Sequence, residues 1–208
     1  MSTPVPFRQR LIERASELYM RIGIRSVSMD DIARELGVSK KTIYQEVDNK
    51  QELVSLVMAE DARRDLVCIQ QNLDGSRDAI DELLRNARYF IQQMRTINPT
   101  TLHDLQKYYK DVWDTQIREH QAQFRRTIAA NIERGMEEGL YRSDLDGGVL
   151  SYFFVGSMMT IIDTTIFPAT TRPITDIIRQ HSAYHLHGIV NEFGRERLDD
   201  YLRTESLD

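Results

Sequence analysis

The first quarter of the chain carries apolar residues at helical spacing. Between residues 7 and 22 they recur mostly at steps of three and four, which is the period of a helix with one buried face. Gly23 stands where that helix should end. Ser28, followed three residues later by Asp31, has the form of a capping box, and it predicts a second helix of about two turns that ends at Gly37.

Two more helix starts follow at short intervals. After the turn at Gly37 and Val38, Ser39 can cap a third short helix that includes residues 40–45, and Asn49 can cap a fourth. Two short helices joined by a tight glycine turn, the second beginning with a cap and two lysines, form the helix-turn-helix pattern. In that motif the second helix offers side chains to bases in the major groove of DNA, while capped helix N-termini can hold phosphates.

Beyond residue 50 every segment with a clear pattern has a helical period, and no stretch alternates apolar and polar residues long enough to predict a sheet. The sequence therefore predicts an all-α protein. We expect an N-terminal three-helix helix-turn-helix domain over residues 1–50 and a helical ligand-binding and dimerisation domain over residues 51–208. The helices expected in the second domain cover residues 50–72, 77–95, 99–109, 111–138, 147–166 and 173–193.

Composition narrows the class of protein. Only 10 Gly and 5 Pro occur in 208 residues, which excludes collagen-like and Pro/Gly-rich low-complexity chains. The single Cys68 leaves no internal disulfide and no zinc or redox CxxC pair, which favours a reducing compartment. The net charge is -5, but residues 1–50 carry nine Lys and Arg against seven Asp and Glu. This asymmetry suggests that the N-terminal segment meets an anionic partner.

The stretch from Gly147 to Thr171 contains only one charged residue, Asp163, and is long enough to raise the question of a membrane helix. Small and polar residues dilute it, and Pro168 would interrupt it, so a buried or interface helix is the stronger interpretation. The first ten residues lack an apolar core of signal-peptide length. We therefore expect a cytoplasmic protein without a membrane segment.

Three segments of the N-terminal domain resemble the DNA-binding domain of TetR-type transcriptional regulators. They are Ser28-Met29-Asp30-Asp31-Ile32-Ala33, then Gly37-Val38-Ser39-Lys40-Lys41-Thr42-Ile43-Tyr44, then Asn49-Lys50-Gln51-Glu52-Leu53, and the likeness extends over residues 8–58. The resemblance implies a homodimeric repressor that binds a palindromic operator in double-stranded DNA. It also implies a divergent helical C-terminal domain that binds a small-molecule effector and dimerises, with no cofactor.

The resemblance also assigns roles within the predicted DNA contacts. Tyr44 and Lys50 would contact phosphate, Lys40 would contact phosphate or base, and Thr42 and Gln45 would face the groove. The full set of expected DNA-binding residues is Ser28, Ser39, Lys40, Lys41, Thr42, Tyr44, Gln45 and Lys50. Lys41 stands where the family often has Gly, and Gln45-Glu46-Val47 replace the usual aromatic or His followed by Phe, so the operator sequence stays open.

A second, weaker likeness covers residues 134–142 and 144–146, a segment that precedes the final helices of the regulatory domain in this family. It favours the helices near 147–166 and 173–193 as the dimerisation pair. Large apolar residues at helical spacing could line an effector pocket or be plain core. The pocket candidates are Met94, Tyr109, Trp113, Phe124, Phe153 and Met158.

His181, His185 and His187 cluster near the chain's C-terminal end, and the first two are spaced so that both could reach one metal ion. Without a carboxylate three or four residues from either, interface or surface histidines are the stronger interpretation, and we expect no metal site. The sequence holds no GxSxG, phosphate-binding Gly loop or HExxH motif, which argues against an enzyme. The alternative that stays open is a helical protein-interaction adaptor with a degenerate DNA-binding domain.

Overall fold

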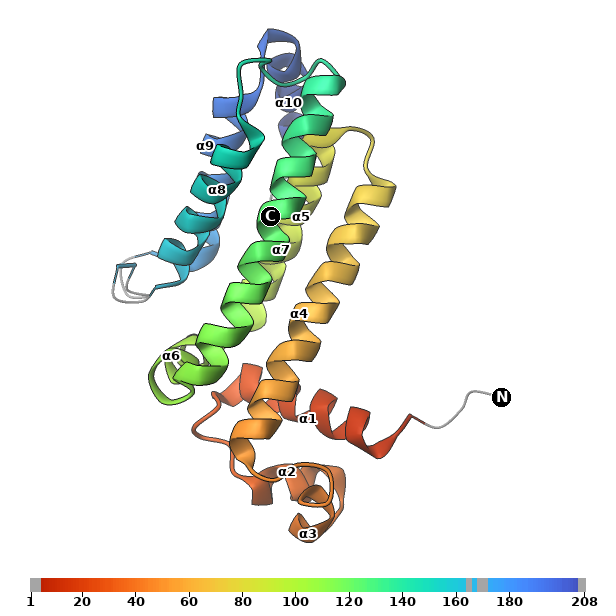
Figure 1. Cartoon of the computed structure of the whole chain (residues 1–208), viewed down its shortest axis with the longest axis vertical. Coiled ribbons are helices and arrows are strands. Elements are labelled where there is room, and N and C mark those ends of the chain that lie inside the picture. Colours follow the sequence, from red (N-terminus) through yellow and green to blue (C-terminus); the bar gives the residue numbers. More distant parts are fainter. Residues whose placement is uncertain (1–4, 164–165, 168–171, 206–208) are drawn as a thin grey trace. The chain divides into compact units, whose positions relative to one another are not determined.

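The computed structural model of the chain describes residues 5–163, 166–167 and 172–205. These residues form helices and connecting turns, with one isolated antiparallel bridge between Tyr141 and Val190 (Figure 1). The predicted all-α class is confirmed. The helices are α1 (Phe7–Ile22), α2 (Met29–Leu36), α3 (Lys40–Ile43), α4 (Lys50–Gly75), α5 (Ala79–Thr96), α6 (Pro99–Tyr108), α7 (Lys110–Glu137), α8 (Gly147–Ile162), α9 (Ile174–Ile189) and α10 (Glu192–Thr204).

Helix starts follow the capping residues that the sequence provides. Ser28 and Asp31 form a reciprocal capping box at α2: the Asp31 amide donates to the Ser28 hydroxyl over 3.1 Å, and the Ser28 amide donates to the Asp31 carboxylate over 2.9 Å. Ser39 caps α3, and Asn49 accepts from the Glu52 amide at the start of α4. Each of these caps agrees with the sequence pattern, because capping depends on residues only three positions apart.

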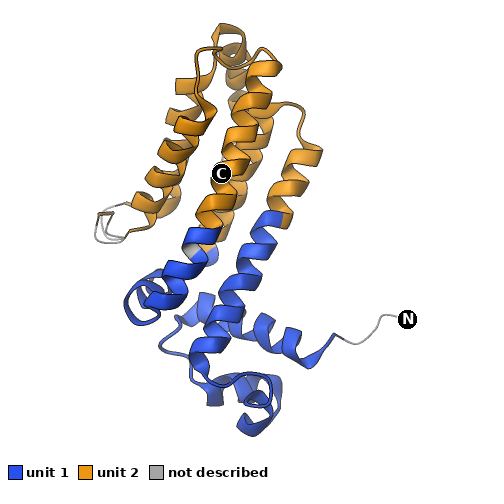
Figure 2. Cartoon of the chain, viewed as in Figure 1, with its two compact units in different colours: residues 1–66, 96–119 blue, residues 67–95, 120–208 orange. Residues whose placement is uncertain are grey.

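The chain divides into two compact units (Figure 2). Unit 1 comprises residues 1–66 and 96–119, and unit 2 comprises residues 67–95 and 120–208. The domain boundary predicted at residue 50 separates an expected DNA-binding part from an expected ligand-binding part, and it stays a prediction. Packing follows a different division, since α6 and the first parts of α4 and α7 belong to the same unit as α1, α2 and α3.

The core of unit 1 fixes the short helices α2 and α3 against their neighbours. Ile32 of α2 and Ile43 of α3 are fully buried in one cluster with Leu11 of α1 and Leu53 of α4. Val47, which is smaller than the Phe of the TetR-type pattern, is only 3% exposed and belongs to this cluster. It is therefore buried in the core beside α3. Burial on this scale holds α3 in place far more firmly than its length would allow alone.

Unit 2 has one cluster of buried residues over α5, α7, α9 and α10, and a second over α5, α8 and α9 that contains Ile91, Ile161 and Ile178. No helix among the described residues is long and apolar enough to cross a membrane. The predicted helix 147–166 ends at Ile162, while residues 164 and 165 and the predicted break at Pro168 lie outside the described residues.

The helix expected over residues 173–193 is in fact two helices. Helix α9 ends at Ile189, Val190 and Asn191 are extended, and α10 begins at Glu192. The Asn191 side chain caps α10 by accepting from the Gly194 amide over 2.9 Å. The prediction of one continuous helix was wrong because the Asn cap follows directly on α9, without the Gly or Pro that commonly marks a helix end.

Candidate nucleic-acid interface

Helices α2 and α3 are joined by a three-residue turn of fixed geometry. Gly37 adopts the left-handed conformation, with φ of 66°, and the Val38 amide donates to the Ala33 carbonyl over 3.0 Å. A glycine is favoured here because side chains with a Cβ adopt this conformation at an energetic cost. The turn and the buried Ile32 and Ile43 together set the angle between the two helices. This arrangement is a helix-turn-helix with α3 as its second helix.

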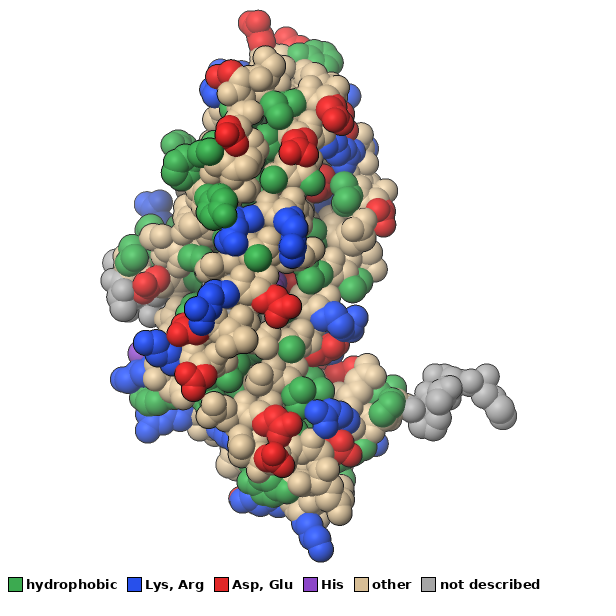
Figure 3. Space-filling model, in the orientation of Figure 1, with side chains coloured by type: hydrophobic (Ala, Val, Ile, Leu, Met, Phe, Trp, Pro, Cys, Tyr) green, Lys and Arg blue, Asp and Glu red, His purple; other side chains and the backbone are tan. Residues whose placement is uncertain are grey.

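The side chains of α3 and the following turn form the exposed part of this motif. Lys40, Lys41, Tyr44 and Gln45 are exposed, with Tyr44 43% exposed. Figure 3 shows blue Lys and Arg side chains at the bottom of the view, where Figure 1 places α3. Cationic and polar side chains on an exposed second helix suit contact with phosphates and base edges.

Lys40 is paired within the motif. Its ammonium group donates to the Asp30 carboxylate over 3.0 Å, and this bond raises the pKa of Lys40. Asp30 lies on α2, so the pair links the two helices of the motif through exposed side chains. Sequence reasoning did not single out Asp30, whose position ten residues before Lys40 gives no local signal.

Lys50, at the start of α4, points its ammonium group into unit 1. The group donates to the carbonyls of Ile24 and Val27 over 2.6 and 2.5 Å, and it lies 5.9 Å from the centre of the Tyr19 ring. Partial burial lowers the pKa of Lys50, opposed by the carboxylates of Asp104 and Asp31. In this geometry Lys50 holds the loop between α1 and α2, and the phosphate contact expected from the sequence stays a prediction.

Glu46 would be unfavourable beside a phosphate, and its carboxylate has a cationic neighbour. The Arg8 guanidinium of α1 donates to the Glu46 carbonyl over 2.7 Å and lies 3.8 Å from its carboxylate. The partner is therefore an arginine of α1, which sequence reasoning did not identify.

The remaining predicted contacts divide into two groups. The hydroxyl of Ser28 bonds the Asp31 carboxylate, and the hydroxyls of Ser39 and Thr42 bond each other over 2.8 Å. Their polar atoms are thus already used in capping. Among the described residues, no intramolecular hydrogen bond or ion pair holds the remaining three side chains, which are Lys41, Tyr44 and Gln45.

Helix α6 is bonded to the end of α1 and to the loop that follows it. The buried Thr101 hydroxyl donates to the Tyr19 carbonyl over 2.7 Å, and the Asn98 amide donates to the Met20 carbonyl over the same distance. Asp104 accepts from the Arg25 amide over 2.7 Å. Three separate residues of α6 and its cap therefore hold the segment that leads into the helix-turn-helix.

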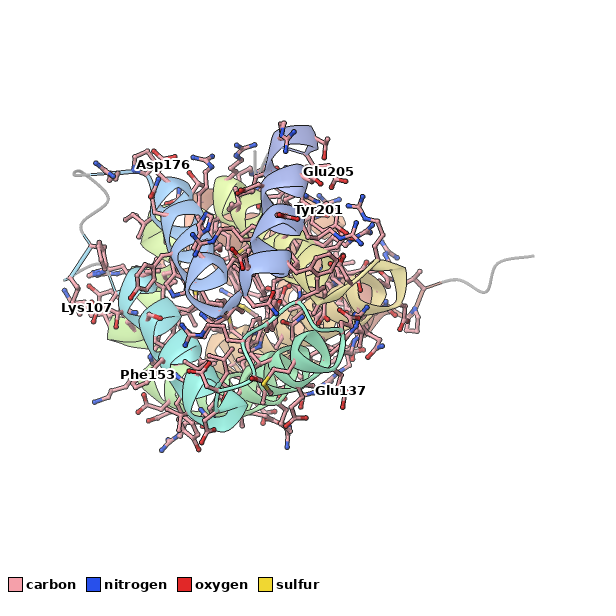
Figure 4. All side chains as sticks on the ribbon, turned by 90° about the horizontal axis from the view of Figure 1, so that it is seen from above. Lys107, Glu137, Phe153, Asp176, Tyr201 and Glu205 are labelled. Atoms are coloured by element: carbon pink, nitrogen blue, oxygen red, sulfur yellow. The ribbon has the colours of Figure 1, made fainter. Side chains whose placement is uncertain are left out.

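The six pocket candidates are dispersed. Tyr109 and Trp113 pack against the core of unit 1, whereas Met94 and Met158 pack together against the second cluster of unit 2. Phe124 stacks with His120 at a ring-centroid distance of 4.9 Å and lies 5.1 Å from Phe90. Phe153 is 68% exposed, and Figure 4 marks it on the outer side of α8. An open depression of about 480 Å³ in unit 1 lies elsewhere, between the starts of α4 and α7, and none of the six pocket candidates lines it.

His181 and His185 pack between α8 and α9. Their rings lie 4.9 and 4.7 Å from the Phe154 ring, and the His181 Nε2 atom is 2.8 Å from the Ser157 hydroxyl. Burial lowers the pKa of both residues, that of His185 to about 4. Among the described residues there is no group of three or more His, Cys, Asp or Glu side chains that could hold a metal ion. His187 is exposed.

An all-α chain with an exposed, capped second helix in a helix-turn-helix belongs to the class of helix-turn-helix transcriptional regulators. The profile of the tetR family of bacterial regulatory proteins matches residues 11–57. The chain is also 24% identical to an HTH-type transcriptional regulator of Staphylococcus aureus over 160 residues, which span 77% of this chain and 80% of the relative. Residues 11–57 are therefore similar to the DNA-binding segment of tetR-family regulators, and the chain as a whole is similar to an HTH-type transcriptional regulator.

Solved structures share the fold. A transcriptional regulator from Cytophaga hutchinsonii has a TM-score of 0.75 at 13% identity, over 88% of this chain and 98% of that one. A transcriptional regulator from Saccharomonospora viridis, solved in complex with choline, has a TM-score of 0.66 at 22% identity, over 89% of this chain and 98% of that one. At these identities the likeness concerns the fold, while the family signature lies in the N-terminal domain.

Proposed function

We propose that the protein is a homodimeric repressor that binds a palindromic operator and is released from it by a small-molecule effector. The observation that carries this proposal is the exposed face of α3, where Lys41, Tyr44 and Gln45 point outward from a buried and capped helix-turn-helix. A bacterial regulator of this kind acts on DNA in the cytoplasm.

The dimer would form through α8 and α9. Tyr152 and Phe153 of α8 are 66% and 68% exposed, and Tyr184 of α9 is 81% exposed. Large aromatic side chains at such exposure suit an isologous interface, in which the same surface of both protomers is buried. Two-fold pairing would also place one helix-turn-helix on each half-site of an inverted repeat.

The effector would bind among the apolar and aromatic side chains of unit 2. The stacked Phe90, His120 and Phe124 and the half-buried Met94 and Met158 offer the mostly apolar lining typical of small-molecule sites. The choline complex of the Saccharomonospora viridis regulator supports the idea that this fold can hold a small molecule. Mass spectrometry of ligand released from the purified protein would identify an effector that copurifies.

Release from DNA requires that the effector favours a conformation with the wrong separation of the two α3 helices. Helix α6 is the element suited to transmit such a change, because Asn98 and Thr101 hold the end of α1 and Asp104 holds the loop that follows it. A displacement of α6 would therefore pull directly on the backbone that leads into the helix-turn-helix.

The affinity for duplex DNA as a function of salt tests the proposal. A regulator whose dimer makes six to ten phosphate contacts should lose about 10³- to 10⁵-fold in affinity between roughly 50 and 200 mM salt. Fluorescence anisotropy of a labelled duplex measures this slope. A protein-interaction adaptor with a degenerate helix-turn-helix would show no steep slope and no preference between duplexes, and that result would overturn the proposal.

A further inference from the structure

We infer that Lys41 and Gln45 are the residues that read the operator, and that each half-site contains a guanine contacted by Lys41 and an adenine contacted by Gln45. This inference rests on the proposed function, because it specifies the DNA that the proposed regulator binds. It concerns two of the positions at which the chain departs from the pattern of the TetR-type regulators that it resembles.

The first step is the division of the predicted DNA contacts by what they already bind. Lys40 is paired with Asp30, and the Lys50 ammonium group is bonded to two backbone carbonyls. The hydroxyls of Ser28, Ser39 and Thr42 are used in capping. To bind a base, these five side chains would have to give up or share those contacts, at a small cost for the exposed Lys40–Asp30 pair and a larger one for Lys50. Lys41, Tyr44 and Gln45 have no such contact to give up among the described residues.

The second step is the chemistry of the remaining three side chains. Tyr44 has one phenol group, which suits a single bond to a phosphate oxygen, and it stands beside the buried Ile43. Lys41 is a cationic donor that matches the two acceptors, O6 and N7, on the major-groove edge of guanine. Gln45 carries both a donor and an acceptor, and so it matches N7 and the amino group of adenine.

The third step is the register of the two side chains. Tyr44 donates to the Lys40 carbonyl, and Gln45, in the turn that follows α3, donates to the Thr42 carbonyl. The chain therefore keeps coiling after α3, and the exposed Lys41 and Gln45 lie about one turn apart along it. Four residues advance a helix by about 6 Å, whereas successive base pairs are about 3.4 Å apart. The guanine and the adenine should therefore lie about two base-pair steps apart.

The charges near α3 favour Lys41 as a residue that contacts DNA. Asp30 neutralises Lys40, and Arg8 lies close to the Glu46 carboxylate that would otherwise repel DNA. Lys41 then remains as the one lysine of the sequence 39–45 without a carboxylate partner among the described residues. Its positive charge is available to the groove, and its position after the Ser39 cap places it in the first turn of α3.

Selection of bound sequences from a random duplex pool tests the inference. Wild-type protein should enrich an inverted repeat whose half-sites each contain the guanine and the adenine. Lys41→Ala should lose the guanine preference by about 10- to 100-fold and keep the adenine, and Gln45→Ala should show the reverse. Lys110→Ala, which removes an exposed lysine of α7 outside the motif, should enrich the wild-type sequence and serves as the charge-matched control.

The variant Lys41→Gln is expected to gain a new base preference, and a misfolded protein could not show such a gain. This variant should exchange the guanine for an adenine at one position of each half-site, since glutamine matches adenine. If the Lys41 variants enrich the wild-type sequence with a reduced salt slope, Lys41 binds phosphate and the inference is wrong, while the proposed function stands. If wild-type protein enriches no sequence, the proposed function fails and the inference fails with it.

Discussion

Lys50 is a charged residue whose ammonium group serves two backbone carbonyls of the loop between α1 and α2. Those carbonyls belong to Ile24 and Val27, and both residues are buried in the core of unit 1. Such a lysine stabilises the loop by satisfying acceptors that would otherwise lack a partner. Its effect on DNA binding would then act through the position of α2 and α3.

We expect Lys50→Met to lower the free energy of unfolding by about 1–3 kcal/mol, because the variant leaves two acceptors unsatisfied. Urea unfolding measures this loss. DNA affinity should also fall, but the slope of log affinity against log salt should stay unchanged. A slope reduced by about one unit for each protomer would instead show that Lys50 contacts phosphate, as first expected from the family likeness.

Asp61 of α4 is a carboxylate held against α1. The Ser16 hydroxyl donates to its two oxygens over 3.0 and 3.2 Å, and the Arg64 guanidinium lies 3.8 Å away. Burial raises the pKa of Asp61 to about 6, helped by the nearby Asp65 and Glu60 carboxylates and opposed by Ser16 and Arg64. At neutral pH the protein therefore holds a carboxylate in a site that disfavours its charge.

Because the pKa of Asp61 is higher in the folded than in the unfolded state, its contribution to stability is complete below about pH 4 and is lost as the pH rises through about 6. Asp61→Asn should remove this loss and raise the free energy of unfolding at pH 7 by about 1–3 kcal/mol, with little change near pH 4. Urea unfolding across this range is the measurement. Glu17→Gln on the exposed side of α1 is the control, and an Asp61→Asn effect that does not depend on pH would contradict the account.

At the scale of elements, local signals predicted the helix starts well. The capping box at Ser28, the Ser39 cap and the Asn49 cap all involve residues within three positions of one another. The break after Ile189 escaped prediction because it depends partly on the distant segment around Tyr141, whose bridge to Val190 fixes the extended residues there. Gly194 must also lack a Cβ, which would otherwise collide with the Leu140 carbonyl.

The sequence could predict which residues lie on the exposed side of α3, but not the contacts that these residues make within the protein, and their contact with DNA stays a prediction. The pattern of glycine turn, cap and lysines identified the outward side of α3, and the residues expected there are exposed. The pairs Lys40–Asp30 and Arg8–Glu46 join residues that are 10 and 38 positions apart, so no local pattern announces them. Likewise, the Tyr201 hydroxyl of α10 donates to the buried Asp78 over 2.6 Å, and these two residues are 123 positions apart. Figure 4 labels Tyr201 on α10 and Glu205 just beyond the end of that helix.

The packing of α8 against α9 contains a pH-sensitive group. Burial lowers the pKa of His185 to about 4, helped by the charge of His181, so the unfolded chain binds its proton more readily than the folded one does. Stability from this residue is complete above about pH 6.5 and is lost as the pH falls toward 4. The groups that contact it are His181 on its own helix and Phe154 of α8.

We expect His185→Phe to reduce the acid-induced loss of unfolding free energy between pH 6.5 and 4 by up to about 3 kcal/mol. The aromatic replacement keeps a ring beside Phe154 and removes the proton-binding nitrogen. Chemical denaturation at several pH values measures the difference from wild type. His187→Gln, at an exposed position two residues further along α9, should leave the acid profile unchanged. Equal pH dependence in wild type and His185→Phe would contradict this interpretation.

At the scale of the whole molecule, the proposed two-fold dimer would form through the exposed aromatic surface of α8 and α9, and operator binding would depend on that surface. We expect Phe153→Glu to shift the protein to monomers in analytical ultracentrifugation and to weaken operator binding by at least about 100-fold, because a buried unpaired carboxylate costs several kcal/mol. Phe193→Glu is the matched control, since Phe193 is 61% exposed but lies on α10. If Phe153→Glu stays dimeric and binds the operator with wild-type affinity, the dimer interface does not include Phe153, and the proposed interface is wrong.

The ratio between the affinity for the selected inverted repeat and the affinity for a scrambled duplex of the same composition tests the central claim most directly. The acidic net charge of the chain, -5, makes unspecific attraction to DNA a weak explanation for any tight binding. If the protein is the proposed regulator and reads its operator through α3, it should bind the repeat at least about 10³-fold more tightly than the scrambled duplex at physiological salt. Equal affinity for the two duplexes would contradict the account.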